Sequence, residues 1–123
     1  MTDLLGVANQ FILFYYQKFD ENRAELGSLY RDDSMLTFES ESRQGVQSIV
    51  DKLTSLQFQK VRHSVSTKDA QPNGRNGVVL LVTGHLFVDD SENPLGFSQC
   101  FQLQQDAAGS WYVFNDLFKL VMG

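Results

Sequence analysis

The chain has 123 residues, of which 42% are hydrophobic, and this fits one folded domain and excludes a disordered chain. Its 15 acidic residues outnumber its 10 basic ones, and the net charge of −5 argues against general nucleic-acid binding. The single Cys100 excludes an internal disulfide and a cysteine-based zinc site, and the longest apolar run, Val78–Val82, is far too short to span a membrane. We therefore expect a soluble protein with a basic partner and without metal, nucleic acid or membrane as ligands.

Hydrophobic spacing and turn residues divide the chain into elements. Apolar residues at helical spacing predict three helices, over Leu4–Phe19, Asn22–Tyr30 and Gln44–Leu56. Asn22 with Glu25 three residues later is typical of a helix N-terminus. Alternating or continuous apolar runs predict five strands, over Ser34–Glu39, Gln59–Thr67, Val78–Val88, Phe97–Leu103 and Ser110–Leu120. Helices segregated from a mostly antiparallel sheet make the expected fold class α+β.

Two predicted strands are apolar on both faces. Val78–Val82 is apolar at every position, and Ser110–Leu120 is expected to turn Val113 and Leu117 to one side and Phe118 to the other. Three helices can cover one face of a sheet only, so the second face needs a partner. We expect a homodimer that forms through the sheet, and a sheet curled tightly enough to cover itself is the alternative.

Four segments resemble the nuclear transport factor 2 family, and the resemblance runs in order from about residue 8 to residue 120. They are FYYQKFD (14–20), LGSLYRDDSMLTFE (26–39), FQKVRHSVSTKDAQP (58–72) and FNDLFKL (114–120). The resemblance implies a single domain over residues 1–123, folded as a cone with a strongly bent antiparallel sheet on three helices and an apolar pocket.

The resemblance also implies a function. The family forms homodimers through the sheet and carries the GDP-bound form of the small GTPase Ran into the nucleus. It binds the FxFG repeats of nuclear pore proteins on the way, and it has no enzymatic activity or cofactor. We therefore expect a protein of the cytoplasm and nucleus that concentrates at the nuclear envelope and pore complex.

The implied Ran-binding site lies at the mouth of the pocket. Phe38 would line the mouth, Glu39 would pair with a basic residue of Ran, and His63 would stand at the pocket wall. The other lining residues that the resemblance implies are Leu56, Phe58, Val61 and Phe118. From the residues alone, Phe38 is a core aromatic, Glu39 a solvated acid and His63 a core histidine with satisfied hydrogen bonds.

An acidic loop completes the implied site. Asp89 corresponds to the first of two acids that face a lysine of Ran, and the second is either Asp90 or Glu92. From the residues alone, this loop is a solvated turn. An aromatic side chain of the Ran switch region would enter the pocket, and it is presented only in the GDP form.

Two further surfaces follow from the resemblance. Leu81, Cys100 and Leu117 would face the dimer partner, and Cys100 would be a small packing residue rather than a nucleophile. The FxFG-binding position in the first turn of the first helix is Leu4 or Leu5, where some members of the family have an aromatic residue.

An enzyme is the competing interpretation, because the same cone hosts isomerases and dehydratases. In that reading His63 and Asp116 form an acid–base pair that acts on a small apolar ketone or alcohol. The alternative role for Asp116 is a carboxylate held in structural hydrogen bonds.

Overall fold

The computed structural model describes residues 4–56 and 60–121, and these form the expected α+β fold. The helices are α1 (Leu4–Glu21), the 3-10 helix η1 (Arg23–Leu29) and α2 (Val46–Thr54). The strands are β1 (Tyr30–Phe38), β2 (Glu41–Gln44), β3 (Val61–Pro72), β4 (Val78–Val88), β5 (Leu95–Gln105) and β6 (Trp111–Val121). The sequence does not predict β2, because its four residues are all exposed and show no hydrophobic alternation.

The six strands form one sheet in the order β2-β1-β6-β5-β4-β3. Every neighbouring pair is antiparallel except β1 and β6, which are parallel, so the expectation of an antiparallel sheet is corrected at this pair. Parallel strands need a long connection, and α2 with β3, β4 and β5 lies between these two strands in the chain. No local turn signal in the sequence could reveal such a pairing.

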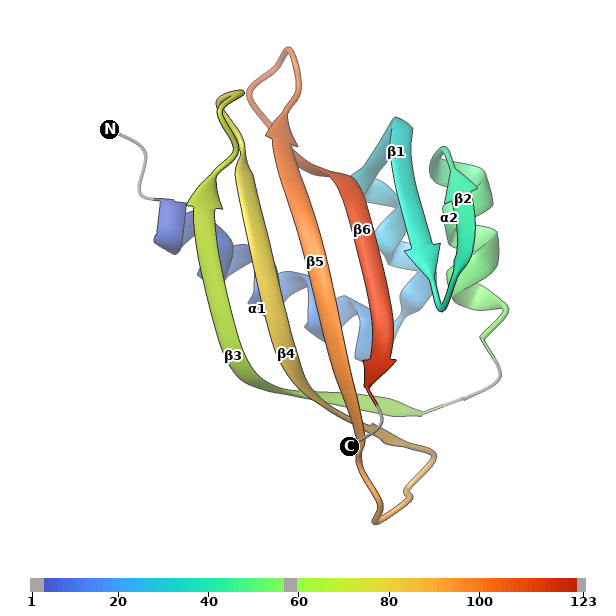
Figure 1. The fold of residues 1–123 in the computed structure, drawn as a ribbon. Coiled ribbons are helices and arrows are strands. Elements are labelled where there is room, and N and C mark those ends of the chain that lie inside the picture. The colour runs from blue at the N-terminus through green and yellow to red at the C-terminus, as the bar shows by residue number, and fades with distance from the viewer. Residues whose placement is uncertain (1–3, 57–59, 122–123) are drawn as a thin grey trace.

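The helices lie on one side of the sheet. In Figure 1, α1 and α2 lie behind the strands, and the opposite face of the sheet is turned toward the viewer. Within residues 4–56 and 60–121, no helix is long and apolar enough to cross a membrane.

Strand β3 bends strongly across the end of the sheet (Figure 1). At the bend, the register with β4 shifts between Val65 and Thr67, which is a β-bulge. Gly84 lies opposite Val65, and a Cβ atom at Gly84 would lie 2.2 Å from the carbonyl oxygen of Ser64. Only a residue without a side chain permits this approach of two backbones, so Gly84 is part of what allows the sheet to bend.

Two buried rows of side chains cross the sheet beneath the helices, and no member is more than 9% exposed. One row contains Leu80, Phe101, Asp116 and Leu36, and the next contains Val82, Gln99, Phe118 and Phe38. The parallel pairing of β1 with β6 therefore places Phe38 directly beside Phe118.

The row between them faces the open side, and its centre is Leu81, Cys100 and Leu117 on neighbouring strands. Thr37 and Asp69 continue the row on β1 and β3. In β6, Phe114 is an extra residue, because Leu103 pairs with Val113 while Gln102 pairs with Asn115. This bulge interrupts the alternation, so Val113 is buried while Leu117 is exposed. The expectation that Val113 and Leu117 share a face is wrong for that reason.

Asn22 begins η1 as the sequence predicts. Its Oδ1 accepts a hydrogen bond from the backbone N–H of Ala24 at 3.2 Å, and its Nδ2 donates to Glu25 at 3.4 Å. The cap satisfies a donor that would otherwise lack a partner at the helix start, and it directs the chain from α1 toward β1.

Candidate functional site

Two tight turns present predicted acids. Glu39 and Ser40 connect β1 to β2, and Asp89 and Asp90 follow β4; their φ angles are 50°, 73°, 50° and 62°. Each such left-handed conformation costs a residue with a side chain about 1 kcal/mol, whereas glycine adopts it freely. Both turns follow the lower ends of their strands in Figure 1, the β1–β2 turn on the right at about mid-height and the β4–β5 turn at the bottom. Glu39 and Asp89 thus follow strand ends that point the same way, and they stand where glycine would be less strained.

An aromatic stack lies behind the β1–β2 turn. The Phe38 and Phe118 rings are parallel within 4° at a centroid distance of 4.4 Å, and Phe118 stacks on Phe97 at 5.7 Å. Lys52 Nζ, which is 2.6 Å from Glu41, lies 5.9 Å from the Phe38 ring centroid. The structure therefore joins the predicted Phe38 and Phe118, and it adds Lys52, which helical spacing alone did not mark.

Glu39 is fixed against the end of β6. Its backbone N–H donates to the Phe118 carbonyl at 3.1 Å, and its carboxylate accepts from the backbone N–H of Leu120. The side chain is nevertheless exposed, so one carboxylate oxygen can be used for binding while the other is anchored.

His63 lies on the wall that extends this stack. Its ring meets Phe97 edge-on at 5.5 Å and stacks on Tyr16 at 4.3 Å. Its Nδ1 atom is 2.6 Å from Oδ1 of Asp20, a residue near the end of α1 that the sequence analysis missed. The missed signal was the position of Asp20 one helical turn after the buried Tyr16, on the apolar face of the helix.

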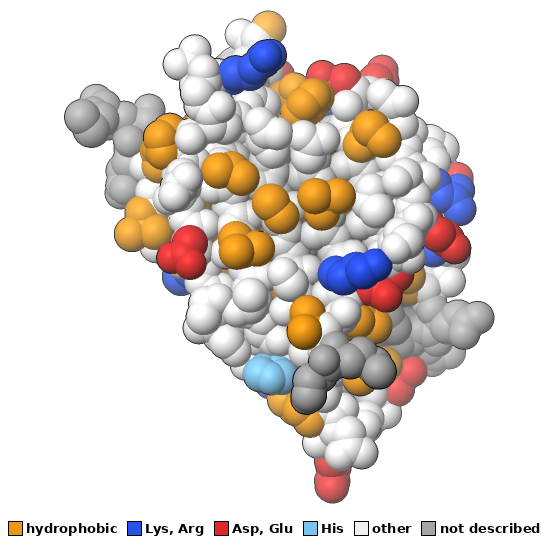
Figure 2. Space-filling view, viewed as in Figure 1, with side chains coloured by type: hydrophobic (Ala, Val, Ile, Leu, Met, Phe, Trp, Pro, Cys, Tyr) orange, Lys and Arg blue, Asp and Glu red, His pale blue; other side chains and the backbone are white. Residues whose placement is uncertain are grey.

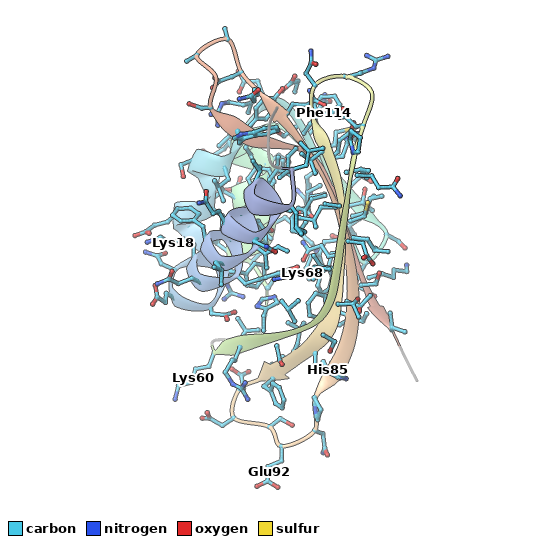
Figure 3. All side chains as sticks on the ribbon, turned by 90° about the vertical axis from the view of Figure 1, so that its left-hand side faces the viewer. Lys18, Lys60, Lys68, His85, Glu92 and Phe114 are labelled. Carbon is cyan, nitrogen blue, oxygen red and sulfur yellow. The ribbon has the colours of Figure 1, made fainter. Side chains whose placement is uncertain are left out.

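Lys60 contacts both aspartates of the β4–β5 turn. Asp89 Oδ1 accepts from the backbone N–H of Lys60 at 2.8 Å, and Lys60 Nζ lies 3.5 Å from Asp90. The two side chains of that ion pair are 76% and 81% exposed, so the pair is worth about 1 kcal/mol or less and can exchange for a partner's cation. Glu92 lies at the hairpin tip and points away from the body of the protein (Figure 3). The choice between Asp90 and Glu92 as the second binding acid stays a prediction.

The structure describes two of the three other residues that were predicted to line the pocket. Val61 is buried and Leu56 is half-buried at the edge of the core. Phe58 lies outside the described residues. Val61 also borders a cavity of about 310 Å³ that Lys60, Phe87 and Asp90 line.

Asp116 lies in a buried network of hydrogen bonds and does not contact His63. Tyr15 and Tyr30 donate to its Oδ2 at 3.1 and 2.8 Å, and Gln99 donates to its Oδ1 at 2.8 Å. Burial raises the pKa of Asp116 to about 6, although the three donors oppose the shift. Both carboxylate oxygens have partners within the core, so this geometry matches the structural role that the sequence left open rather than an acid–base pair.

The open face of the sheet is apolar at its centre (Figure 2). Leu81 and Leu117 are 46% and 53% exposed on either side of the half-buried Cys100. Burial, with a smaller effect of Asp116, raises the pKa of the Cys100 thiol and lowers its reactivity. Met35 of β1 and Val121 of β6 add further exposed apolar side chains to this face.

The two leucines of the first helical turn differ in placement. Leu5 is 55% exposed, whereas Leu4 packs against the core and lines a cavity of about 620 Å³ with Pro72 and Trp111. This cavity lies near the β3–β4 and β5–β6 turns, at the end of the molecule opposite the acidic turns (Figure 1). Trp111 thus brings an aromatic ring beside the predicted Leu4.

In the described part of the chain, no three His, Cys, Asp or Glu side chains lie close enough together to hold a metal ion. The sequence-predicted residues lie in three places: the acidic turns with the aromatic stack, the apolar sheet face, and the cavity beside Leu4. The first two adjoin, because Ser40, Cys100 and Leu117 line one hollow.

Comparison with known proteins decides the family. The model of the nuclear transport factor 2 (NTF2) domain matches residues 7–120. The chain belongs to the nuclear transport factor 2 family. It is 57% identical over 122 residues to nuclear transport factor 2 of Emericella nidulans, with 98% of each chain covered. It is 56% identical over 120 residues to the Neurospora crassa protein of that name, covering 98% of this chain and 97% of the relative.

Solved structures agree with this family. The structure of nuclear transport factor 2 from Cryptosporidium parvum has a TM-score of 0.87 and 45% identity, and the match covers 92% of this chain and 90% of that one. Other solved structures with 12–19% identity have TM-scores of 0.78–0.85, which shows a shared fold alone. The resemblance and the cone-like α+β fold that it implied are therefore confirmed.

Proposed function

We propose that this chain is a nuclear import carrier for Ran in its GDP-bound form. The family and the close relatives named as transport factors support a role in nuclear transport rather than enzymatic catalysis. The observation that carries the proposal is the strained β1–β2 turn, which presents the exposed Glu39 next to the Phe38–Phe118 stack. The strained turn after β4 presents Asp89 and Asp90 as further acids. A partner that suits this site has an aromatic side chain with basic residues around it, which is what the family implies for Ran.

Binding energy would come mainly from the aromatic anchor. Burying one phenylalanine-sized side chain contributes roughly 1.5–3 kcal/mol, whereas each exposed ion pair contributes about 0.2–1 kcal/mol. The acids would therefore set the rate and orientation of association. If the Ran switch presents its aromatic side chain only with GDP bound, the site selects that conformer without contacting the nucleotide.

Calorimetric titration with GDP-loaded and GTP-loaded Ran tests the proposal. We expect binding to the GDP form only, and we expect Glu39→Lys to abolish it by placing a cation opposite the basic partner. Asp32→Lys is the matched control, because Asp32 is exposed near the other end of β1 and the variant changes the net charge equally. Equal affinity for both nucleotide forms, or equal loss in both variants, would refute the proposal.

We propose the open sheet face as the homodimer interface. The row of Leu81, Cys100 and Leu117 would pack against the same row of a second copy, since an isologous interface uses one patch twice. This surface is on the opposite side of the sheet from α1. It borders the β1–β2 turn, because Ser40 lines one hollow with Cys100 and Leu117.

The cavity beside Leu4 is our proposed place for an FxFG phenylalanine. Its lining by Leu4, Pro72 and Trp111 supplies apolar contacts and one aromatic ring, and Leu5 extends the exposed apolar surface. Trp111→Ala should weaken the capture of an FxFG-repeat peptide while Ran binding is unchanged. Together these two binding activities predict a protein that moves between cytoplasm and nucleus and concentrates at the pore complex.

A further inference from the structure

We propose that Asp20 is a positioning residue that fixes the tautomer of His63, so that the site accepts a hydrogen-bond donor from its partner at Nε2. This inference rests on the proposed function, because His63 belongs to the proposed Ran-binding site. It adds a residue of α1 to that site and states which chemical group His63 can bind.

Asp20 holds both the backbone and the ring of His63. Asp20 Oδ2 accepts from the backbone N–H of His63 at 3.1 Å, and Oδ1 lies 2.6 Å from Nδ1 of the ring. The His63 side chain is 1% exposed and that of Asp20 is 23% exposed. Water therefore competes little for these hydrogen bonds, and the two contacts act as one bidentate clamp from the end of α1 onto the start of β3.

The chemistry of the clamp decides where the proton of the imidazole resides. An ionised carboxylate has no hydrogen to donate, so a hydrogen bond between Asp20 and Nδ1 requires the proton on Nδ1. In the neutral ring, Nε2 then carries a lone pair and can only accept. Since the two nitrogens lie on different edges of the ring, Nε2 is turned away from Asp20.

Aromatic neighbours keep the ring from rotating and exchanging its nitrogens. Tyr16 stacks on it at 4.3 Å, and Phe19 and Phe97 meet it edge-on at 4.9 and 5.5 Å. Tyr16 is itself held, because its hydroxyl donates to Gln99 at 2.8 Å. A rotation of the His63 ring would break the contact with Asp20 and disturb all three ring contacts.

Because the His63 side chain is 1% exposed, a partner reaches Nε2 only if the aromatic lining around the ring moves aside. The group that fits there is an N–H or O–H donor, such as a backbone amide of the segment that carries the aromatic anchor. A carbonyl oxygen at the same place would face the lone pair of Nε2 and would be rejected. The contact with Asp20 thus makes Nε2 of His63 bind only a hydrogen-bond donor on the incoming backbone, whereas a ring with a free choice of tautomer could bind a donor or an acceptor.

The substitution Asp20→Asn separates this role from a merely structural one. The backbone N–H of His63 still needs an acceptor, so the amide oxygen turns to it, and the amide NH₂ group then faces Nδ1. Nδ1 must now accept, which moves the proton to Nε2 with almost no change of shape. Glu21→Gln is the matched control, because Glu21 is the next residue, is exposed, and loses the same charge.

Nitrogen-15 NMR of the imidazole at a pH at which it is neutral reports the tautomer directly. We expect the proton on Nδ1 in the wild type and in Glu21→Gln, and on Nε2 in Asp20→Asn. Ran-GDP affinity should fall by between about fivefold and about a hundredfold in Asp20→Asn, since two donors then face each other, and should be unchanged in Glu21→Gln.

The outcomes that overturn the proposal are distinct. A wild-type proton on Nε2 refutes the clamp even if the Asp20→Asn variant does not fold, and so does an unchanged tautomer in a folded variant. A changed tautomer with unchanged Ran-GDP affinity refutes the claim that Nε2 accepts a hydrogen bond from the partner. A wild type that does not bind Ran-GDP refutes the proposed function and the readout together, whereas the NMR spectrum still decides the clamp.

Discussion

Asp116 should make the stability of this protein depend on pH in an unusual direction. It is buried, and no cation pairs with it among residues 4–56 and 60–121. Burial raises its folded-state pKa to about 6, above the value of about 3.9 for an unfolded aspartate. The folded state therefore holds the proton more tightly than the unfolded chain. The stabilisation that protonation gives is complete below about pH 4 and is lost as the pH rises through about 6.

The size of the effect follows from the difference between these two pKa values. Each pKa unit corresponds to about 1.4 kcal/mol, so a difference of about two units gives about 3 kcal/mol. The variant Asp116→Asn has no proton to exchange. Its oxygen can face Gln99, and its NH₂ group can face the hydroxyls of Tyr15 and Tyr30, which rotate to accept.

Urea unfolding of both proteins between pH 4 and pH 7, at one fixed protein concentration, measures this difference. We expect the wild type to lose about 2 kcal/mol relative to Asp116→Asn as the pH rises over this range, because part of the full difference develops below pH 4 and above pH 7. Subtracting the two curves removes the other carboxyl groups that both proteins share. Asp32→Asn, the same change at an exposed position, should give a flat difference.

If the difference in unfolding free energy between the wild type and Asp116→Asn also did not change with pH, the claim that burial raises the pKa of Asp116 would be refuted. It would mean that the three hydrogen-bond donors compensate fully for the loss of hydration, so that Asp116 ionises equally easily in both states. A difference of the opposite sign would mean that the donors more than compensate, and the folded-state pKa would then lie below that of the unfolded chain.

Three further substitutions test the fold and the dimer. Leu117→Glu should convert the dimer to a monomer in sedimentation velocity, because it would bury an unpaired charge in the interface. Leu13→Glu, at a 73% exposed position of α1, should leave the dimer intact. A dimeric Leu117→Glu variant would contradict the proposed interface. Gly84→Ala should lower the unfolding free energy by about 1–3 kcal/mol, because its Cβ would meet the backbone of Ser64, and a neutral result in urea unfolding would show that the bend can relax. Asn22→Ala should cost about 1 kcal/mol in the same assay, while an equal stability would show that the cap contributes nothing.

The sequence predicts those parts of the fold that local chemistry decides. Asn22 caps η1 because its side chain bonds a backbone group two residues away, and such a signal is visible in any short window. The parallel pairing of β1 with β6 depends on groups that are far apart in the chain, so no local pattern contains it. The bulge at Phe114 has no turn residue to mark it, and this is why the facing of Val113 was predicted incorrectly.

The candidate site shows the same division. Phe38 and Glu39 could be named from a segment that resembles the family, and Asp89 from the acidic loop. The structure packs Phe38 on Phe118 and bonds the backbone of Glu39 to β6. The residues that hold them were missed, because their roles exist only after folding. Asp20 meets His63 from another element, across 43 positions in the chain.

Strand β6 links the three parts of the structure through alternation alone. Asp116 points into the hydrogen-bond network, Leu117 points to the open face, and Phe118 points into the aromatic stack. Because successive side chains lie on opposite faces, a shift of one residue would expose Asp116 and Phe118 together and bury Leu117. The bulge at Phe114 sets this register after Val113, so it decides at once which surface can dimerise and which can receive a partner's ring.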